Sequence, residues 1–384
     1  EVFEQLPVHD VVSWSALISA YAQNGCGDEA LECFQRMQDS GISPDRVTYI
    51  GILKACGHVR SLEIGQEIDA DIRKQGLLQK DVVLGNALVH MYCKCGSLEK
   101  AREVFEQLPH QNVVTWSAMI TGYCQHGLGD QALECFREMQ NAGIRPDAVT
   151  YVCILKASMP KKSLSHAKEV YEHVMCSRHI GLQGFLADYM VVTLAKCGGA
   201  EDAWNVSRGL VRRTVFSWSA IISSYVDCGR FADALRLYQE MREERIAPNR
   251  YTLVSLVKAC GNMHDLVQGK MLHDEARSKG FASDPHLGST LVSMYGKCGN
   301  TFGAENVFSL LPSHDVVTWN AMLSAYTEND QGEKTLDLYR HMRNQAVHID
   351  VCTLVCALQA CTEICNLDMC KKLHFDSLFA GLDL

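Results

Sequence analysis

The sequence predicts an all-α protein, an α-solenoid of stacked helix-turn-helix repeats, and three observations support this. Tryptophans recur 102, 102 and 101 residues apart, at Trp14, Trp116, Trp218 and Trp319. Each lies in a near-copy of one phrase: VVSWSALISAY, VVTWSAMITGY, VFSWSAIISSY and VVTWNAMLSAY. No segment sustains the alternation of polar and apolar residues that is typical of a β-strand. A fixed long period indicates a repeat array rather than one compact core.

Each period divides into repeats of 35, 36 and 31 residues, which we name standard, long and short. Residues 1–10 are the tail of a preceding short repeat, because EVFEQLPVHD recurs at 103–112 as EVFEQLPHQN. The expected ranges are 11–45, 46–81 and 82–112; 113–147, 148–183 and 184–214; 215–249, 250–284 and 285–315; then 316–350 and an incomplete 351–384. The whole chain, 1–384, is therefore expected to form one array.

Each repeat is expected to contain two helices. In repeat 11–45, the first apolar face follows helical spacing and comprises Trp14, Leu17, Ile18 and Tyr21. Glycines at 25 and 27 interrupt the pattern, and a second face follows at Ala30, Leu31, Phe34 and Met37. Gly41 and Pro44 are typical of a helix end. Helices this short cannot bury their faces alone, so successive repeats must stack.

Composition places the chain among folded proteins without membrane spans. It has 47% hydrophobic and 21% charged residues, and no apolar run approaches the roughly 20 residues that cross a bilayer. The net charge of −9 argues mildly against a nucleic-acid partner, although it leaves room for a locally basic groove. Many of the 18 cysteines recur at one repeat position, so we expect reduced thiols in the core.

The chain begins within a repeat, at Glu1, without a methionine or a targeting segment. We therefore expect a fragment of a longer protein, in which the absence of a leader says little about location.

The repeats resemble those of pentatricopeptide-repeat proteins, in the plant-type class that alternates standard, long and short motifs. The phrases that carry the resemblance are VVxWxAxI, with GI.PD at the repeat end, in standard repeats, VTY..ILKAC in long ones, and ALV.MY.KCGSLE.A..VFE.LP in short ones. The resemblance covers essentially the whole chain. It implies a right-handed superhelix that binds single-stranded RNA, with one base read per repeat by two or three side chains.

By this resemblance, the fifth and last residues of a repeat form a reader pair that contacts the base edge. The pairs are Ser15 with Asp45, Asn86 with Asn112, Ser117 with Asp147, Asp188 with Thr214, Ser219 with Asn249, Ser289 with Asp315, and Asn320 with Asp350. The second residue of each repeat is expected to sandwich the base. These residues are Val12, Val83, Val114, Phe185, Phe216, His286 and Val317.

The family's pairing rules imply a target of roughly 5′-G-x-Y-G-x-x-A-x-G-U-3′, where Y is a pyrimidine and x is unassigned. Ser with Asp implies guanine, Ser with Asn adenine, Asn with Asp uracil, and Asn with Asn a pyrimidine. Asp188 with Thr214 departs from these rules, as does Gln183 at the end of its repeat. Pro160 and its neighbours make 158–165 the least regular stretch, so bases from the middle of the chain are unassigned.

Several residues have a second, structural interpretation. A terminal Asp or Asn also suits a helix N-cap, which we expect two or three residues before the helix. The long repeats carry apolar fifth residues, so they either accept any nucleotide or face elsewhere: Ile50, Val152, Val254 and Val355. Three lysines at equivalent places in the short repeats could contact phosphates, but a helix-end role is favoured: Lys94, Lys196 and Lys297.

We expect no catalysis, cofactor or metal in this chain. His273 and Glu275 match the H-x-E half of a zinc deaminase signature, but no P-C-x-x-C follows. A nuclease would need an acidic metal cluster, which we do not find outside the repeats. The main rival is a protein-binding solenoid of the tetratricopeptide type, which the acidic balance favours. The resemblance implies a mitochondrial or chloroplast protein that directs C-to-U editing, with a deaminase beyond Leu384 or supplied in trans.

Overall fold

The computed structural model describes residues 3, 9–159, 163–176, 184–210, 212–345, 347–371 and 373. The expected irregularity around Pro160 and the end residue Gln183 lie outside these residues. The described part of the chain is helical and contains no strand. It divides into two compact halves, Glu1–Thr193 and Leu194–Leu384, which we describe separately. No described helix is both long and apolar enough to cross a membrane.

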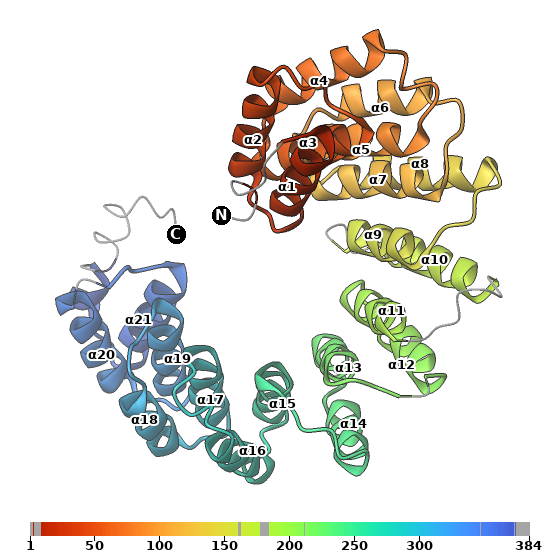
Figure 1. Cartoon of the computed structure of the whole chain (residues 1–384). Coiled ribbons are helices and arrows are strands. Elements are labelled where there is room, and N and C mark those ends of the chain that lie inside the picture. The colour runs from red at the N-terminus through yellow and green to blue at the C-terminus, as the bar shows by residue number, and fades with distance from the viewer. Residues whose placement is uncertain are drawn as a thin grey trace. The chain divides into compact units, whose positions relative to one another are not determined.

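The helices come in pairs that follow the expected order (Figure 1). The first helices of the repeats are α1 (Val11–Gln23), α3 (Arg46–Val59), α5 (Val82–Lys94), α7 (Val113–Gln125), α9 (Ala148–Ser158), α11 (Phe185–Lys196), α13 (Val215–Asp227), α15 (Arg250–Met263), α17 (Pro285–Lys297), α19 (Val316–Thr327) and α21 (Val351–Glu363). The second helices are α2 (Gly27–Asp39), α4 (Leu62–Lys74), α6 (Leu98–Gln107), α8 (Gly129–Asn141), α10 (Leu164–Cys176), α12 (Ala200–Arg208), α14 (Phe231–Glu243), α16 (Leu266–Ser278), α18 (Thr301–Leu310) and α20 (Gly332–Asn344). The predicted helix-turn-helix fold is confirmed.

First helices pack on first helices to form a continuous layer within each half. In the N-terminal half, α1, α3, α5, α7 and α9 contact one another in sequence. In the C-terminal half, α13, α15, α17, α19 and α21 do the same. A second helix packs on the first helix of the next repeat, as α2 does on α3 and α14 on α15. The first helices thus form one layer and the second helices cover it.

The recurrent tryptophans are core residues of this double layer, as the periodicity predicts. All four are buried, and Trp218 is completely inaccessible. Each packs near an aromatic ring from the preceding short repeat; for example, the ring centroids of Phe105 and Trp116 are 4.6 Å apart, and those of Phe308 and Trp319 5.1 Å. This contact joins consecutive repeats through large aromatic side chains, so the Trp period marks a recurrent apolar connection between periods.

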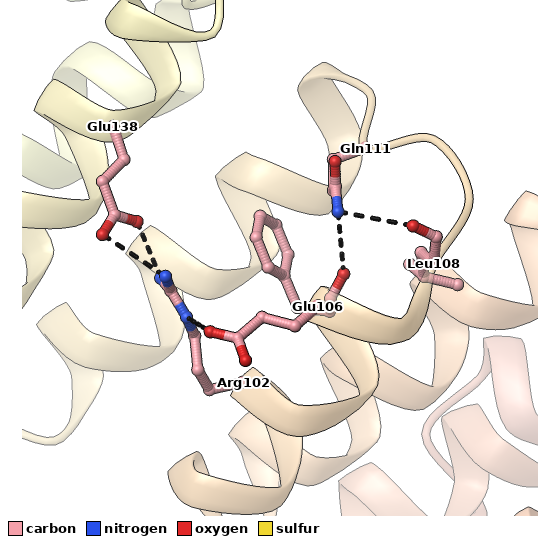
Figure 2. A network of polar contacts seen from close by, with 6 residues as sticks. Arg102, Glu106, Leu108, Gln111 and Glu138 are labelled. Atoms are coloured by element: carbon pink, nitrogen blue, oxygen red, sulfur yellow. Dashed lines mark hydrogen bonds and ion pairs between the residues drawn. The ribbon is translucent and has the colours of Figure 1, made fainter.

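Ion pairs between side chains link neighbouring second helices. Arg102 on α6 donates to both carboxylate oxygens of Glu138 on α8 and to Glu106 of its own helix (Figure 2). Gln111 donates to the main-chain carbonyl of Leu108 in the loop that follows α6. Arg137 and Glu169 form an equivalent pair between α8 and α10. These exposed ion pairs each contribute little free energy, about 0–1 kcal/mol, but they hold neighbouring second helices in register.

Candidate nucleic-acid interface

Each reader pair lies at the junction between two repeats, where one repeat ends and the next first helix begins. In the first junction, Asp45 is the N-cap of α3 and accepts a hydrogen bond from the main-chain N–H of Thr48 at 2.8 Å. Its Oδ1 atom also accepts from the Thr48 hydroxyl at 2.8 Å and from Ser15 Oγ at 3.0 Å. Ser15 is buried and lies 2.7 Å from Thr48 Oγ1. Three side chains from two successive repeats therefore form one polar cluster.

The same junction recurs along the chain. Direct contacts join Asn86 Nδ2 to Asn112 Oδ1 at 3.5 Å, Ser219 Oγ to Asn249 Oδ1 at 3.2 Å, and Asn320 Nδ2 to both oxygens of Asp350 at 3.0 and 2.9 Å. The fifth and last residues of a repeat, 26 to 30 residues apart in sequence, are thus brought together as the resemblance implies. Within each of these pairs, the two polar side chains lie within hydrogen-bonding distance of each other.

The remaining predicted pairs are less direct. Ser117 reaches Asp147 through Thr150, whose hydroxyl lies 2.6 Å from Ser117 Oγ and 2.7 Å from Asp147 Oδ1. The Ser289 hydroxyl instead donates to the main-chain carbonyl of His286 at 3.0 Å.

Thr214, the last residue of its repeat, caps α13 and accepts from the main-chain N–H of Ser217 at 3.3 Å. Its expected partner Asp188 lies in the first turn of α11.

The terminal residues are N-caps, but the expected spacing was wrong. Asp45, Asn112, Asp147, Asn249 and Asp315 lie directly before the helices that they cap, not two or three residues earlier. A cap accepts the N–H of the third helical residue, which only an adjacent side chain can reach.

Capping consumes only one of the two side-chain polar atoms. In the same five residues, Oδ1 accepts the cap bonds, and no described group hydrogen-bonds to the other atom: Asp45, Asn112, Asp147, Asn249 and Asp315. In an aspartate that other atom is an acceptor oxygen. In an asparagine it is the Nδ2 donor, because the main-chain N–H requires the oxygen to face the cap. The two interpretations of these residues, cap and reader, are therefore compatible.

The second residues of the repeats form a set of exposed apolar side chains. Those predicted to sandwich bases are exposed, with Val12 67% and Phe216 68% accessible: Val12, Val83, Val114, Phe185, Phe216, His286 and Val317. Phe185 is the first rather than the second helical residue, because α11 begins one residue into its repeat. Apolar side chains that recur beside a polar cluster in this way are typical of a binding surface.

Sequence reasoning missed the equivalent residues of the long repeats. Val47, Val149 and Tyr251 are second residues too, and all three are exposed like the others. Their position in the repeat could have identified them. The second residues of these long repeats are thus exposed apolar or aromatic side chains, like most of those in the neighbouring repeats.

Two of the long repeats, 46–81 and 250–284, differ in that an ion pair closes their polar junction. Arg46 donates from its Nε and Nη2 atoms to the two oxygens of Asp81, the last residue of the same repeat. Arg250 Nη1 likewise donates to Asp284 Oδ2 at 2.8 Å. In these two long repeats the guanidinium contacts the oxygen that is left open in the reader pairs, and the fifth residue is apolar. In these two repeats both carboxylate oxygens of the terminal aspartate are thus bonded within the protein.

Hydrogen bonding at the junctions keeps the capping carboxylates ionised. Burial opposes ionisation of Asp45, but bonds from Thr48 and Ser15 outweigh it and lower its pKa. For Asp350, burial is likewise outweighed by bonds from Thr353 and Asn320, which lower the pKa. For Asp315, the Thr318 hydroxyl is the main cause of a lowered pKa. Such carboxylates remain hydrogen-bond acceptors across the physiological range.

We expect the stability that these aspartates contribute to be lost only in acid. Their folded pKa values are depressed, so the contribution is complete above the unfolded pKa of about 3.9 and disappears as the pH falls through the folded value. The part of the free energy of unfolding that these aspartates contribute should therefore be nearly constant from about pH 7 to 5 and fall below about pH 4, which urea denaturation measures. Asp350→Asn, which keeps a capping side chain, should flatten that fall; an unchanged slope would contradict the assignment.

Two other groups singled out in the sequence have structural partners. Lys297 ends α17 and donates to Asn262 Oδ1 at 2.7 Å, and Gly299 follows it with a left-handed φ of 75°. His273 lies on α16 with Nδ1 2.9 Å from the Tyr295 hydroxyl. Among the described residues, no group of three His, Cys, Asp or Glu side chains is arranged to hold a metal ion.

The cysteines are free thiols, and many are buried. Burial raises the pKa of Cys56, Cys93 and Cys260 to about 12, so these thiols are protonated and behave as small apolar side chains.

A hollow of about 760 Å³ lies away from the reader pairs, between α6, α7 and α8. Its polar lining includes Glu99, Glu103 and Glu106, together with Arg102, which is already paired with Glu138. A lining of this charge would repel RNA phosphates, so we do not place a nucleic-acid site there.

Comparison with known proteins agrees with an α-solenoid of helix-turn-helix repeats. The family model described as the PPR repeat family matches residues 9–58, 111–159, 213–262 and 314–363, more than half of the chain. A second model, described as PPR repeat, matches residues 86–113 and 289–316. The chain therefore belongs to the PPR, or pentatricopeptide-repeat, family.

Similar proteins include several from Arabidopsis thaliana. One pentatricopeptide repeat-containing protein is 34% identical over 360 residues, which cover 94% of this chain and 52% of the relative. A chloroplastic member is 32% identical over 348 residues, which cover 91% of this chain and 56% of that relative. The chain thus spans about half the length of these relatives. The crystal structure of the maize pentatricopeptide repeat protein PPR10 matches with a TM-score of 0.55 and 18% identity, over 98% of this chain and 65% of that one. It shows the same fold.

Proposed function

We propose that this chain binds single-stranded RNA in a sequence-specific manner through the junctions between its repeats. The proposal rests on the polar side chains at the repeat ends, in which the helix cap bonds to only one of the two polar atoms. One atom of Asp45, Asp147, Asp315, Asn112 or Asn249 is fixed by the cap, and the other is left for a ligand. Exposed apolar second residues next to these atoms supply surfaces on which a base can stack.

The identity of the open atom explains the expected base at each repeat. Guanine and uracil carry a ring N–H on the edge used for base pairing, whereas adenine and cytosine carry a ring nitrogen that accepts. An aspartate with an open oxygen offers an acceptor and so favours a ring N–H, as expected at the guanine positions. At the uracil position both oxygens of Asp350 accept from Asn320, so the expected base there rests on the family's pairing rules. An asparagine offers a donor and so favours adenine or cytosine. The proposed target remains 5′-G-x-Y-G-x-x-A-x-G-U-3′, with the long repeats at three of the unassigned positions.

We predict that the chain binds this RNA at least about tenfold more tightly than a scrambled RNA of equal composition. Each well-made contact to a base edge discriminates by about 1–3 kcal/mol, so several together exceed that factor. Fluorescence anisotropy with both labelled RNAs, at one stated salt concentration, measures the ratio. Equal affinities would contradict base reading and would favour the protein-binding solenoid instead.

We further propose that the protein acts in mitochondria or chloroplasts and directs C-to-U editing, with a deaminase outside this chain or supplied in trans. Relatives named chloroplastic and mitochondrial support the location, and the 35, 36 and 31 alternation supports the editing class. Sequencing organellar transcripts from cells with and without the protein tests this. Loss of editing beside the target sequence is expected, and an unchanged set of edited sites would argue against it.

A further inference from the structure

Threonines at the third position of several repeats take part in the polar cluster of the preceding repeat. Thr252 is completely buried, and its Oγ1 lies 2.8 Å from Ser219 Oγ and donates to Asn249 Oδ1 at 3.0 Å. Thr115 donates to Asn86 Oδ1 at 2.6 Å and to Asn112 Oδ1 at 3.1 Å. In both junctions one threonine, from the next repeat, contacts both members of a reader pair.

The sequence pairs this hydroxyl with polar fifth residues. Where the fifth residue of a repeat is polar, the third residue of the next repeat carries a hydroxyl. These hydroxyls are Thr48, Thr115, Thr150, Ser217, Thr252, Thr318 and Thr353, following Ser15, Asn86, Ser117, Asp188, Ser219, Ser289 and Asn320. Where the fifth residue is apolar, the third residue is leucine. These leucines are Leu84, Leu186 and Leu287, following Ile50, Val152 and Val254.

Capping alone does not account for this pattern. Asp81 and Asp284 cap α5 and α17 through main-chain N–H groups, although their third helical residues are Leu84 and Leu287. A leucine is thus sufficient at the third position of a capped helix. At Thr48, Thr115, Ser217 and Thr353 the hydroxyl also accepts from the main-chain N–H of the cap, so there it serves the helix end as well. The Thr252 hydroxyl contacts both members of its reader pair without such a capping box, so this junction separates the two roles.

We propose that the third-residue hydroxyl is a positioning residue that fixes the reader pair of the preceding repeat, and so sets its base selectivity. At an asparagine, the hydroxyl donates to Oδ1 and thereby helps to keep the Nδ2 donor directed to the base. At an aspartate, both carboxylate oxygens accept, so a looser side chain still presents an acceptor. Selectivity should therefore depend on the hydroxyl most strongly in the repeats that end in asparagine. This inference rests on the proposed RNA binding.

The test compares two isosteric substitutions, Thr252→Val and Thr318→Val. Both threonines are completely buried and bond to a cap, but Thr318 serves Asp315, and the fifth residue Ser289 bonds elsewhere. We expect Thr252→Val to reduce the preference for adenine over guanine at the seventh base by about three- to tenfold, the worth of one hydrogen bond. Thr252→Ser should restore it. Thr318→Val should keep the preference for guanine at the ninth base.

The measurement is competition binding of the variants to target RNAs that differ at one base, with thermal unfolding measured in parallel. An unchanged preference in Thr252→Val, or an equal loss in Thr252→Val and Thr318→Val, overturns the positioning role. If the unsubstituted chain shows no preference at the seventh base, the proposed function itself fails. Thr115→Val gives a second measurement if Thr252→Val does not fold: its preference for a pyrimidine at the third base should fall, and an unchanged preference overturns the inference.

Discussion

Replacing Asn249 with aspartate is expected to change the preferred seventh base of the target from adenine to guanine. In the wild-type chain Asn249 Oδ1 accepts from the N–H and hydroxyl of Thr252, which leaves the Nδ2 donor open. An aspartate would accept the same two bonds and leave an acceptor, which suits the ring N–H of guanine. Because each base contact discriminates by about 1–3 kcal/mol, we expect the affinity ratio to change by about tenfold or more.

The reciprocal substitution provides the matched control. Asp147 occupies the same place in repeat 113–147 and also accepts the N–H and hydroxyl of a threonine, Thr150. Asp147→Asn should change the fourth base from guanine to adenine and leave the seventh base unaffected. Aspartate and asparagine cap helices about equally well, so neither change should alter stability much. Competition binding with four RNAs measures both switches; if both variants keep the wild-type preferences, the open-atom explanation is wrong.

Truncating Trp218 to alanine is expected to reduce the free energy of unfolding by about 3–5 kcal/mol, the usual cost of removing a large buried aromatic side chain. Trp218 is fully buried, and its indole N–H donates to Glu244 at 3.0 Å. The other three recurrent tryptophans, Trp14, Trp116 and Trp319, have buried indole N–H groups with no hydrogen-bond partner among the described residues. Trp218→Ala therefore leaves a cavity and also removes the partner of a carboxylate.

Phe216→Ala, two residues earlier on the same helix, should weaken RNA binding and leave the free energy of unfolding nearly unchanged. Its side chain is mostly exposed, so the unfolding free energy should change by less than about 0.5 kcal/mol. It should weaken RNA binding by about 1–3 kcal/mol, the worth of one stacked base. Urea denaturation measures the stability of the two variants, and fluorescence anisotropy measures their RNA affinity. A large loss of stability in Phe216→Ala, with no change in RNA affinity, would contradict the assignment of Phe216 to the binding surface.

The repeat pattern was sufficient to predict the helices and the core. Trp14, Trp116, Trp218 and Trp319 recur at one repeat position and are buried at equivalent places, because the spacing of apolar residues alone determines which face of a helix can be covered. The pairing of Ser15 with Asp45 also follows from position in the repeat, through family resemblance. Neither prediction required knowledge of contacts between repeats.

Other properties of the junctions could not be predicted from the order of residues. The sequence presented the terminal Asp or Asn as either a cap or a reader, and only the geometry shows that capping uses one atom and leaves the other. It also gave no sign that Thr252 contacts both Ser219 and Asn249, or that Arg46 closes the junction at Asp81. Hydrogen bonds depend on distance and direction between atoms that come from different repeats, and packing alone sets these.

By itself, the sequence thus determined the order and the apolar faces of the helices that the structure describes, since periodicity is a local property of the chain. Only the tertiary structure decided which polar atoms at each junction are satisfied internally and which remain for a ligand. The physical reason is that each polar side chain has few donor hydrogens and acceptor lone pairs. Residues of the adjacent repeat, brought close by stacking, occupy some of them. At Asp45 and Asn249 the atom left over, an acceptor in one and a donor in the other, is what we propose the RNA meets.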